Sequence, residues 1–258
     1  MEIEIDFTKS AQENANEYYK RSKKLALKKE GAEKAIVELQ EKLSAARSDS
    51  SKKRQERLVL KVVKREWYEK FHWFFTSSGM LAIGGRDAHQ NEALNSKHFE
   101  EKDLFFHADV FGADVVILKG GAASDRQVRE EAAQFAASYS SAWRDGMRTA
   151  DVYAMRREQV SKSSSKGSLG TGSFLLSGER DWYRGVQLSL VLFVEGERMH
   201  AVPELTFKRL GKDKVTHAKV TQGNYRKSEA AKKIAAKLGY MDIDSVMRCL
   251  PAGSFRIE

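Results

Sequence analysis

The sequence has few of the residues that mark secreted or membrane-bound proteins. Its 258 residues include one cysteine and two prolines, and no apolar run approaches the about 20 residues that a membrane helix needs. The N-terminal residues carry charges and lack the apolar core of a signal peptide. The single thiol, Cys249, cannot close an internal disulfide and has no neighbouring histidine to activate it. We therefore expect a cytoplasmic protein without membrane association, whose one thiol is buried and unreactive.

Positive charge is in excess and is unevenly distributed. The 45 Lys and Arg residues against 36 Asp and Glu give a net charge of +9, while 41% hydrophobic residues exclude wholesale disorder. Residues 1–70 carry +5 and residues 162–237 carry +8, whereas residues 71–161 carry −3 and residues 238–258 carry −1. Two separate basic blocks indicate a polyanionic partner such as nucleic acid. Lysine-rich helices that simply face solvent are the alternative.

The first block is predicted to be a long projecting helix. Residues 8–47 contain no proline and one glycine, and most are strong helix formers. At 1.5 Å per residue such a helix is about 60 Å long, too long to lie inside a domain of this size. Apolar residues recur at heptad spacing and form one seam, namely Ala11, Tyr18, Leu25, Ala32, Leu39 and Ala46 with Ala15, Ile36 and Leu43.

A short polar stretch, residues 48–54, predicts a turn after this helix. Leu58, Val62 and Val63 give a second helix an apolar stripe, so we expect residues 1–70 to form an antiparallel coiled-coil hairpin within a monomer. Like charges crowd the two arms and would repel unless an anion binds. They are Lys52, Lys53, Arg54 and Arg57 at the tip, and Lys20, Arg21, Lys23, Lys24, Lys28 and Lys29 along one arm.

Residues 71–258 are predicted to form a compact α+β domain around a mixed sheet. The apolar period changes at Phe71, where FHWFFTS and MLAIGG predict a hairpin. Further strands are predicted at LFFHADVF, VVILKG, ADVYAMRR, SFLLSG, VQLSLVLFV, MHAVPELTF and KVTHAKVTQ. Helices are predicted over residues 86–99, 124–148, 227–239 and 243–249. Strands and helices do not alternate regularly, which favours α+β over α/β architecture.

Two acid–histidine pairs follow apolar strands, Asp87 with His89 and His107 with Asp109. A metal-dependent nuclease that uses these four residues is one alternative function. Neither pair has a spacing typical of a metal site. We therefore expect His107 to bond to backbone, Asp87 and Asp109 to cap turns or helices, and Arg86 to contact an anion. No catalytic residue, metal or other cofactor is expected.

Two later segments have the composition of an RNA-binding surface. Residues 160–174 form a polar loop in which Lys162, Lys166 and Thr171 suit phosphate binding, although the GxxxxGK nucleotide-binding pattern is absent. A plain surface loop is the alternative. Arg180 and Arg184 flank two aromatic residues, WY, a mixture typical of RNA-binding surfaces. The alternative is that both rings belong to the core.

Long stretches of the chain follow a known family pattern. They are WYEKFHWFFTSSGMLAIGGRDAHQNEAL, DLFFHADVFGADVVILK, YSSAWRDG and EQVSKSSSKGSLGTGSFLLSGERDWYR, with SAQENANEYYKRSKKL before them and NYRKSEAAKKIAAKL and LPAGSFRIE after them. These stretches resemble the coiled coil and NFACT-R domain of the RqcH/NEMF ribosome quality-control family, and the C-terminal end resembles archaeal members. The matching positions are Gly84, Gly85, Arg86, Asp87, Gln90, Asn91, His107, Ala108, Asp109, Gly112, Lys119, Tyr139, Ser140, Trp143, Gln159, Val160, Ser161, Lys162, Thr171, Gly172, Ser173 and Phe174.

The resemblance implies an RNA-binding module that binds the large ribosomal subunit carrying a stalled peptidyl-tRNA. In full-length members it also implies tRNA recruitment and untemplated C-terminal tailing of the nascent chain, without nucleotide hydrolysis. The partners would be rRNA and tRNA. The expected nucleic-acid-binding residues are Arg86, Asp87, Asn91, His107, Lys119, Lys162, Lys166, Thr171, Arg180 and Arg184 in the domain, and Lys52, Lys53, Arg54 and Arg57 in the coil.

The chain departs from the family pattern in three respects. Asp114 stands where relatives usually carry a small neutral residue, and the loop SSSKGSLG lacks their proline and glutamate. Full-length members also begin with an NFACT-N half, so this chain is expected to be either part of a longer factor or a short member. Besides the nuclease, a coiled-coil scaffold that dimerises through the apolar seam without binding nucleic acid stays an alternative.

Overall fold

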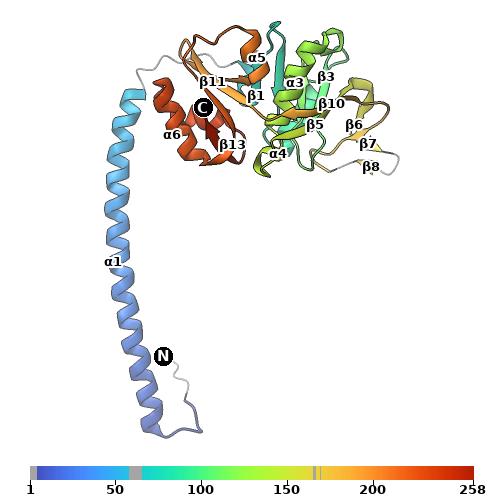
Figure 1. Cartoon of the computed structure of the whole chain (residues 1–258). Coiled ribbons are helices and arrows are strands. Elements are labelled where there is room, and N and C mark those ends of the chain that lie inside the picture. Colours follow the sequence, from blue (N-terminus) through green and yellow to red (C-terminus); the bar gives the residue numbers. More distant parts are fainter. Residues whose placement is uncertain (1–4, 58–65, 165–166, 169) are drawn as a thin grey trace. The chain divides into compact units, whose positions relative to one another are not determined.

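The computed structural model describes residues 5–57, 66–164, 167–168 and 170–258, and it divides into two units, Met1–Lys64 and Arg65–Glu258. The first unit is dominated by one helix, α1 (Ala11–Arg57) (Figure 1). Its 47 residues make it about 70 Å long. The predicted long N-terminal helix is therefore confirmed.

The predicted turn over residues 48–54 is wrong, because the backbone stays helical to Arg57. The stretch contains neither glycine nor proline, and serine and aspartate each lower helix propensity by only about 0.5 kcal/mol. The second arm predicted around Leu58, Val62 and Val63 lies outside the described residues.

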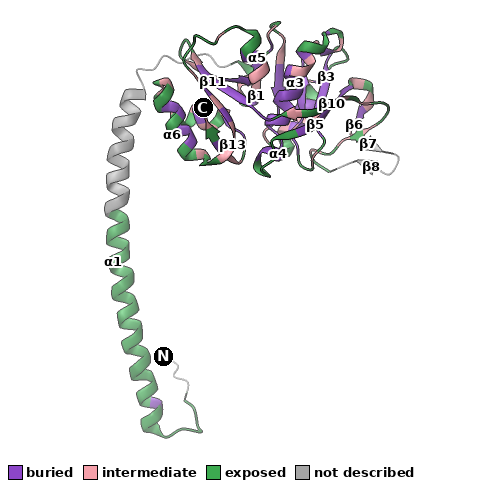
Figure 2. Ribbon diagram, viewed as in Figure 1, coloured by how far each residue is buried: buried purple, intermediate pink, exposed green. Residues whose placement is uncertain are grey.

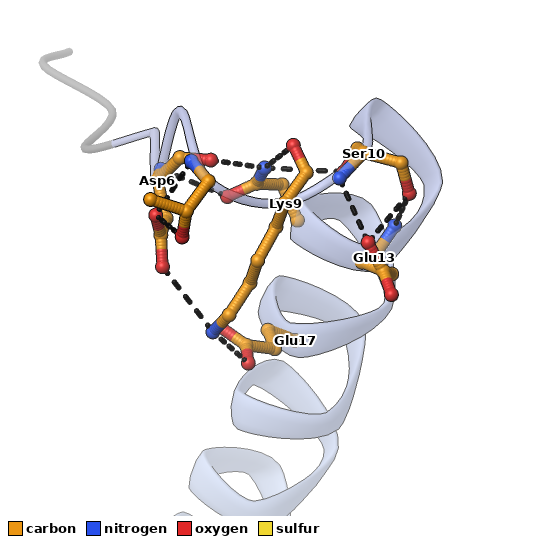
Figure 3. A network of polar contacts seen from close by, with 7 residues as sticks. Asp6, Lys9, Ser10, Glu13 and Glu17 are labelled. Carbon is orange, nitrogen blue, oxygen red and sulfur yellow. Dashed lines mark hydrogen bonds and ion pairs between the residues drawn. The ribbon is translucent and has the colours of Figure 1, made fainter.

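A capping box defines the start of α1 (Figure 3). The backbone N–H and the hydroxyl of Ser10 both donate to Glu13 Oε2 at 2.8 Å, and the Glu13 N–H donates to Ser10 Oγ at 3.3 Å. This reciprocal pair satisfies N–H groups that the first helical turn leaves without partners. The helix consequently begins at Ala11 and not at Thr8.

The residues before α1 fold back onto its first turns (Figure 3). The amide of Asn14 donates to the carbonyls of Asp6 and Ser10 at 3.0 and 3.1 Å, and its Oδ1 accepts from the Asp6 N–H at 3.0 Å. Lys9 Nζ lies 2.6 Å from Glu17 Oε1. This explains why Asn14 is buried while the other described side chains of α1 are exposed (Figure 2).

The apolar seam of α1 faces solvent over the part whose side chains are described. Leu25, Ile36 and Leu39 are 57%, 52% and 63% exposed. Within the described residues of this unit, no second helix covers these side chains. The internal packing predicted for a hairpin is therefore not formed by the described part of the chain.

The second unit is built on two antiparallel sheets (Figure 1). The six-stranded sheet has the order β1-β2-β4-β3-β5-β10, and the four-stranded sheet has the order β12-β11-β13-β14. The six strands are β1 (His72–Phe75), β2 (Leu81–Gly84), β3 (Leu104–Ala108), β4 (Val116–Leu118), β5 (Thr149–Arg156) and β10 (Asp181–Gln187). The four strands are β11 (Leu190–Glu195), β12 (Arg198–Pro203), β13 (His217–Arg226) and β14 (Ser254–Ile257).

Short helices and ribbons complete this unit. The α-helices are α2 (Ala88–Lys97), α3 (Arg126–Ser138), α4 (Ser141–Arg144), α5 (Glu204–Arg209), α6 (Lys227–Leu238) and α7 (Ile243–Cys249). The 3₁₀ turns are η1 (Trp67–Lys70), η2 (Gly121–Ala123) and η3 (Arg157–Gln159). The ribbons pair β6 (Val160–Ser161) with β9 (Leu175–Leu176), and β7 (Ser163–Ser164) with β8 (Gly167–Ser168).

The α+β class is confirmed, with one change of detail. Every pairing between described strands is antiparallel, so the expected mixed sheet is an antiparallel one. Buried side chains alternate between the two faces of the six-stranded sheet, as the strand period requires. On β3, Phe106 packs in the cluster that contains Phe135 of α3, whereas Phe105 packs in the cluster that contains Leu94 of α2. Helices therefore cover both faces of this sheet.

Several predicted helices and strands are shorter than expected. They end where a polar side chain caps a new helix or where the chain passes from one sheet to the other. The helix predicted over residues 124–148 is interrupted because the Ser140 hydroxyl accepts from the N–H of Ala142 at 3.3 Å and caps a separate α4. The strand VQLSLVLFV is split because Leu188 and Ser189 carry the chain from β10 to β11, in the other sheet. MHAVPELTF ends in α5, and β14 has no counterpart among the predicted strands.

Strand β10, labelled in Figure 1, forms one edge of the six-stranded sheet. It contains a bulge. Its register with β5 shifts between Tyr183 and Val186, and Gly185 within the bulge has a φ of +61°. Asp151 fixes this geometry, since it accepts from the Gly185 N–H at 2.8 Å and from Arg184 at 2.6 Å. The bulge re-aims the side chains around it.

We predict that Ser10→Ala loosens the first turns of α1. The substitution removes a cap worth about 1 kcal/mol. Amide hydrogen exchange of the full chain should become several-fold faster over residues 11–17. Ser22→Ala, at an exposed position within α1, serves as the matched control. Equal exchange in the two variants would contradict the capping role.

Candidate nucleic-acid interface

The turn between β2 and α2 carries two of the predicted site residues, Arg86 and Asp87, and it is held by local hydrogen bonds. The carboxylate of Asp87 accepts from the Gln90 N–H at 2.8 Å and caps α2. Gln90 Oε1 accepts from the Arg86 N–H at 3.2 Å, which adds a second bond between the turn and the first turn of α2. The prediction that Asp87 is a cap residue is confirmed.

Asn91, in the first turns of α2, bonds to the residue that precedes β4. Its Oδ1 accepts from the N–H of Val115 at 3.1 Å, and the side chain is buried. A Cβ on Gly85 would lie 2.0 Å from Asn91 Oδ1, so only glycine fits beside it. Asp114 packs against this amide, and burial raises the pKa of Asp114 to about 7. Gly85, Asn91 and Asp114 therefore have structural roles at the start of α2.

Arg86 is a structural clamp. Its guanidinium donates to three backbone carbonyls, those of Lys70 at 3.2 Å, Phe71 at 2.9 Å and Arg248 at 2.7 Å. Burial lowers the pKa of Arg86 from its usual value. These N–H donors, which were expected to contact an anion, thus bond to carbonyl groups of the protein. Through these bonds Arg86 joins segments that are far apart in the sequence.

His107 is bonded to backbone, as predicted. Its Nε2 donates to the carbonyl of Ala113 at 3.1 Å, and the Tyr153 hydroxyl donates to Nδ1 at 3.2 Å. Burial lowers the pKa of His107. No three His, Cys, Asp or Glu residues of the described chain are grouped to hold a metal ion. The described residues therefore give the nuclease alternative no metal site.

Lys119 is paired inside the domain. Its Nζ lies 2.5 Å from Asp103 Oδ2 and 2.9 Å from the carbonyl oxygen of His98. The Asp103 carboxylate is fully buried and also accepts from the N–H groups of Gly120 and Glu100, each at 2.8 Å. The lysine charge is needed there to compensate a buried carboxylate.

Lys162 anchors the polar loop to α2. Its Nζ lies 2.5 Å from Glu92 Oε2 and 2.8 Å from the carbonyl of Gly170, while the Gly172 N–H donates to the same carboxylate at 3.1 Å. The hydrogen bond from Lys162 lowers the pKa of Glu92. Thr171 is exposed in this loop, whereas Lys166 lies outside the described residues.

Arg180 and Arg184 gather around Trp182 on β10 and the loop before it. Arg184 Cζ lies 3.7 Å from the Trp182 ring centroid. Arg180 Cζ lies 4.5 Å from the centroid of Tyr153 and 5.7 Å from that of Trp182. Trp182 is half-buried, whereas Tyr183 belongs to the core. The core interpretation is therefore confirmed for Tyr183, and Trp182 stays available at the surface.

A second group of cations lies on α6 and the end of β13, and the sequence analysis did not single it out. Lys233 Nζ lies 4.5 Å from the ring centroid of Tyr225, which is 38% exposed. Arg226, Lys232 and Lys233 are exposed and form no ion pair with a described carboxylate. The signal was the helical spacing of KSEAAKKIAAK, which places alanines on the buried face and lysines on the other.

The basic residues predicted for the coil all lie on α1. Lys20, Arg21, Lys23, Lys24, Lys28 and Lys29 are exposed, and Lys29 lies 3.9 Å from Glu33. Lys52, Lys53, Arg54 and Arg57 belong to the last turns of the helix, and their side chains lie outside the description. These four residues therefore lie on a continuous helix and not at a hairpin turn.

Comparison with known proteins shows which family this chain is similar to. Residues 70–178 match the family described as NFACT protein RNA binding domain. The chain is 34% identical over 198 residues to the archaeal Rqc2 homolog aRqcH of Methanocaldococcus jannaschii, covering 75% of this chain and 29% of the relative. It is also 34% identical over 198 residues to the ribosome quality control complex subunit NEMF homolog of Drosophila melanogaster, covering 74% and 20%. The chain thus spans less than a third of the length of these relatives.

A solved structure also resembles this chain. It is the C-terminal part of the fibronectin/fibrinogen-binding protein from Streptococcus suis, with a TM-score of 0.40 and 22% identity, covering 50% of this chain and 49% of that one. None of the described helices is long and apolar enough to cross a bilayer.

We predict that Arg86→Ala destabilises the domain. Three carbonyls lose their donor, so the free energy of unfolding should fall by about 3 kcal/mol. Urea denaturation of the full chain measures this loss. Arg144→Ala, which removes a guanidinium that is 62% exposed, is the matched control. A loss no larger than that of the control would show that the clamp is dispensable.

We predict that ionisation of the buried Asp114 carboxyl makes the stability of the domain depend on pH. Its pKa is raised from 3.8 to about 7 in the folded chain, so between these values the folded state binds the proton more tightly than the unfolded state. Stability should therefore fall as pH rises from 4 to 7. Relative to wild type, Asp114→Asn should gain melting temperature over this window and keep the gain above it. The exposed Asp213→Asn is the control, and a gain independent of pH would contradict the prediction.

Proposed function

Because this chain carries an NFACT RNA-binding domain and is a homologue of the Rqc2, NEMF and RqcH proteins, we propose that it binds RNA on the large ribosomal subunit in ribosome-associated quality control. The observation that carries this proposal is the guanidinium cluster around Trp182, where Arg180 and Arg184 lie against the half-buried indole. Aromatic rings interleaved with cations suit both stacking and phosphate contact.

In this proposal the ligands are phosphates and bases of rRNA and of the stalled peptidyl-tRNA. Two described surfaces are available to them. One is the Trp182 cluster, and the other is the α6 surface of Tyr225, Arg226, Lys232 and Lys233. The basic residues of α1 supply a third, elongated surface for the phosphate backbone.

The predicted site residues divide into two roles under this proposal. Those that hold the fold of the domain position its surface, whereas Thr171, Arg180, Arg184 and the basic residues of α1 contact RNA. The positioning residues are Arg86, Asp87, Asn91, His107, Lys119 and Lys162. Tailing of the nascent chain and recruitment of tRNA would require the parts of the relatives that this chain does not match.

We predict that charge reversal on the α6 surface, or on the last turns of α1, weakens binding to large subunits and tRNA. Lys232→Glu with Lys233→Glu, and separately the four α1 changes Lys52→Glu, Lys53→Glu, Arg54→Glu and Arg57→Glu, should each reduce affinity at least tenfold. Each should also flatten the dependence of affinity on salt, because fewer counterions are released. Co-sedimentation with large subunits and filter retention of tRNA measure both effects.

The matched control reverses two charges that are already paired. Lys102→Glu and Arg144→Glu alter side chains that are 72% and 62% exposed and lie near Glu100 and Asp145. This control should bind like wild type. If wild type itself retains no tRNA and light scattering shows a dimer, the scaffold alternative, which uses the exposed seam of α1, replaces the proposed function.

A further inference from the structure

A hollow of about 550 Å³ opens beside strands β5 and β10. Its wall combines the indole of Trp182 with Arg156 and Arg180 and with Glu158 and Glu179. The volume lies within the range of sites that enclose a small ligand or a single nucleotide. Guanidinium, carboxylate and aromatic groups thus meet in one concave site.

The guanidinium of Arg180 is held in this hollow by rings and not by a carboxylate. It lies against Tyr153 and Trp182, and it forms no hydrogen bond or ion pair with any described residue. Arg156 likewise forms no ion pair in the described part of the chain. In contrast, Arg129 on the same wall donates to the Ala122 carbonyl at 3.1 Å and lies 3.8 Å from Asp181. These two guanidiniums are therefore not paired with a carboxylate, although Glu158, Glu179 and Asp181 line the same hollow.

The indole of Trp182 is fixed in place. Tyr153 contacts it edge-on, with ring centroids 5.3 Å apart, and Arg184 lies over it while paired with Asp151. A fixed aromatic wall beside a planar guanidinium is a preorganised surface for stacking a base. Glu158 and Glu179 supply acceptors for the amino groups on base edges.

The surroundings of the hollow suit an extended RNA strand better than an isolated nucleotide. A second hollow of about 300 Å³ is lined by Arg126, Tyr183 and Arg184. Arg184 borders this second hollow and also covers Trp182, which lines the first. A strand of RNA crossing β10 would therefore meet cationic and aromatic groups in succession.

We propose that the hollow beside β10 binds an unpaired RNA nucleotide, which stacks against Arg180 and Trp182 and directs its phosphate at Arg156. This inference rests on the proposed RNA-binding function and names one site within it. A base paired in a duplex cannot enter such a hollow without leaving its stack. The site should therefore distinguish single-stranded from double-stranded RNA.

The test is fluorescence anisotropy of the full chain with a labelled single-stranded RNA decamer and with the matched duplex. Arg180→Gln and Trp182→Leu should each weaken single-strand binding at least tenfold and duplex binding by less than twofold. Trp182→Phe should keep most of the single-strand affinity, because an aromatic ring is retained. Arg144→Gln removes one exposed charge elsewhere and is the matched control. Melting temperatures identify any variant that fails to fold, and Arg180→Gln changes no core residue.

The outcomes separate this site from the function on which it rests. If wild type binds neither RNA, the proposed function fails. If wild type binds RNA but Arg180→Gln and Trp182→Leu behave like Arg144→Gln, the site is wrong and the function stands. If nucleoside monophosphates bind as tightly as the decamer, the assignment to an RNA chain is overturned.

Discussion

The domain depends on hydrogen bonds donated to the backbone of its own C-terminal segment. Arg86 donates to the carbonyl of Arg248 at 2.7 Å, the Tyr139 hydroxyl to that of Cys249 at 2.6 Å, and the Trp143 indole to that of Ser254 at 3.0 Å. A hydrogen bond contributes about 1 kcal/mol to stability, so together these donors help to determine the path of the chain into β14. Through β14 they tie the four-stranded sheet to the layer that contains α3.

Local patterns predicted the elements whose ends are set by neighbouring residues. The cap by Asp87, the β1–β2 hairpin and the termination of α6 at Gly239, with a φ of +63°, all follow from residues within a few positions. The division of the VQLSLVLFV run at Leu188 and Ser189 could not be predicted, because no glycine or proline marks the break. Only the tertiary packing assigns the two resulting strands to different sheets.

The candidate site was harder to predict than the fold, since a basic residue looks the same in sequence whether it is paired or free. The partners of Arg86 include Arg248, 162 positions away, and Lys162 is neutralised by Glu92, 70 positions away. Both were expected to contact anions. Lys232 and Lys233 were overlooked because lysines on a short helix are common in any soluble protein. Pairing over long sequence distances, and not charge itself, decides which cations face a ligand.

The bulge on β10 has a further consequence for the behaviour of the protein in solution. An edge strand normally offers a row of free N–H and C=O groups to any other extended chain, which promotes aggregation. Here the shift between Tyr183 and Val186, with Gly185 in a left-handed conformation, breaks the regular ladder. The exposed guanidinium of Arg184 adds a charge at the same point. The edge that carries the cationic cluster is thereby a poor template for cross-β growth, even where many copies are crowded together.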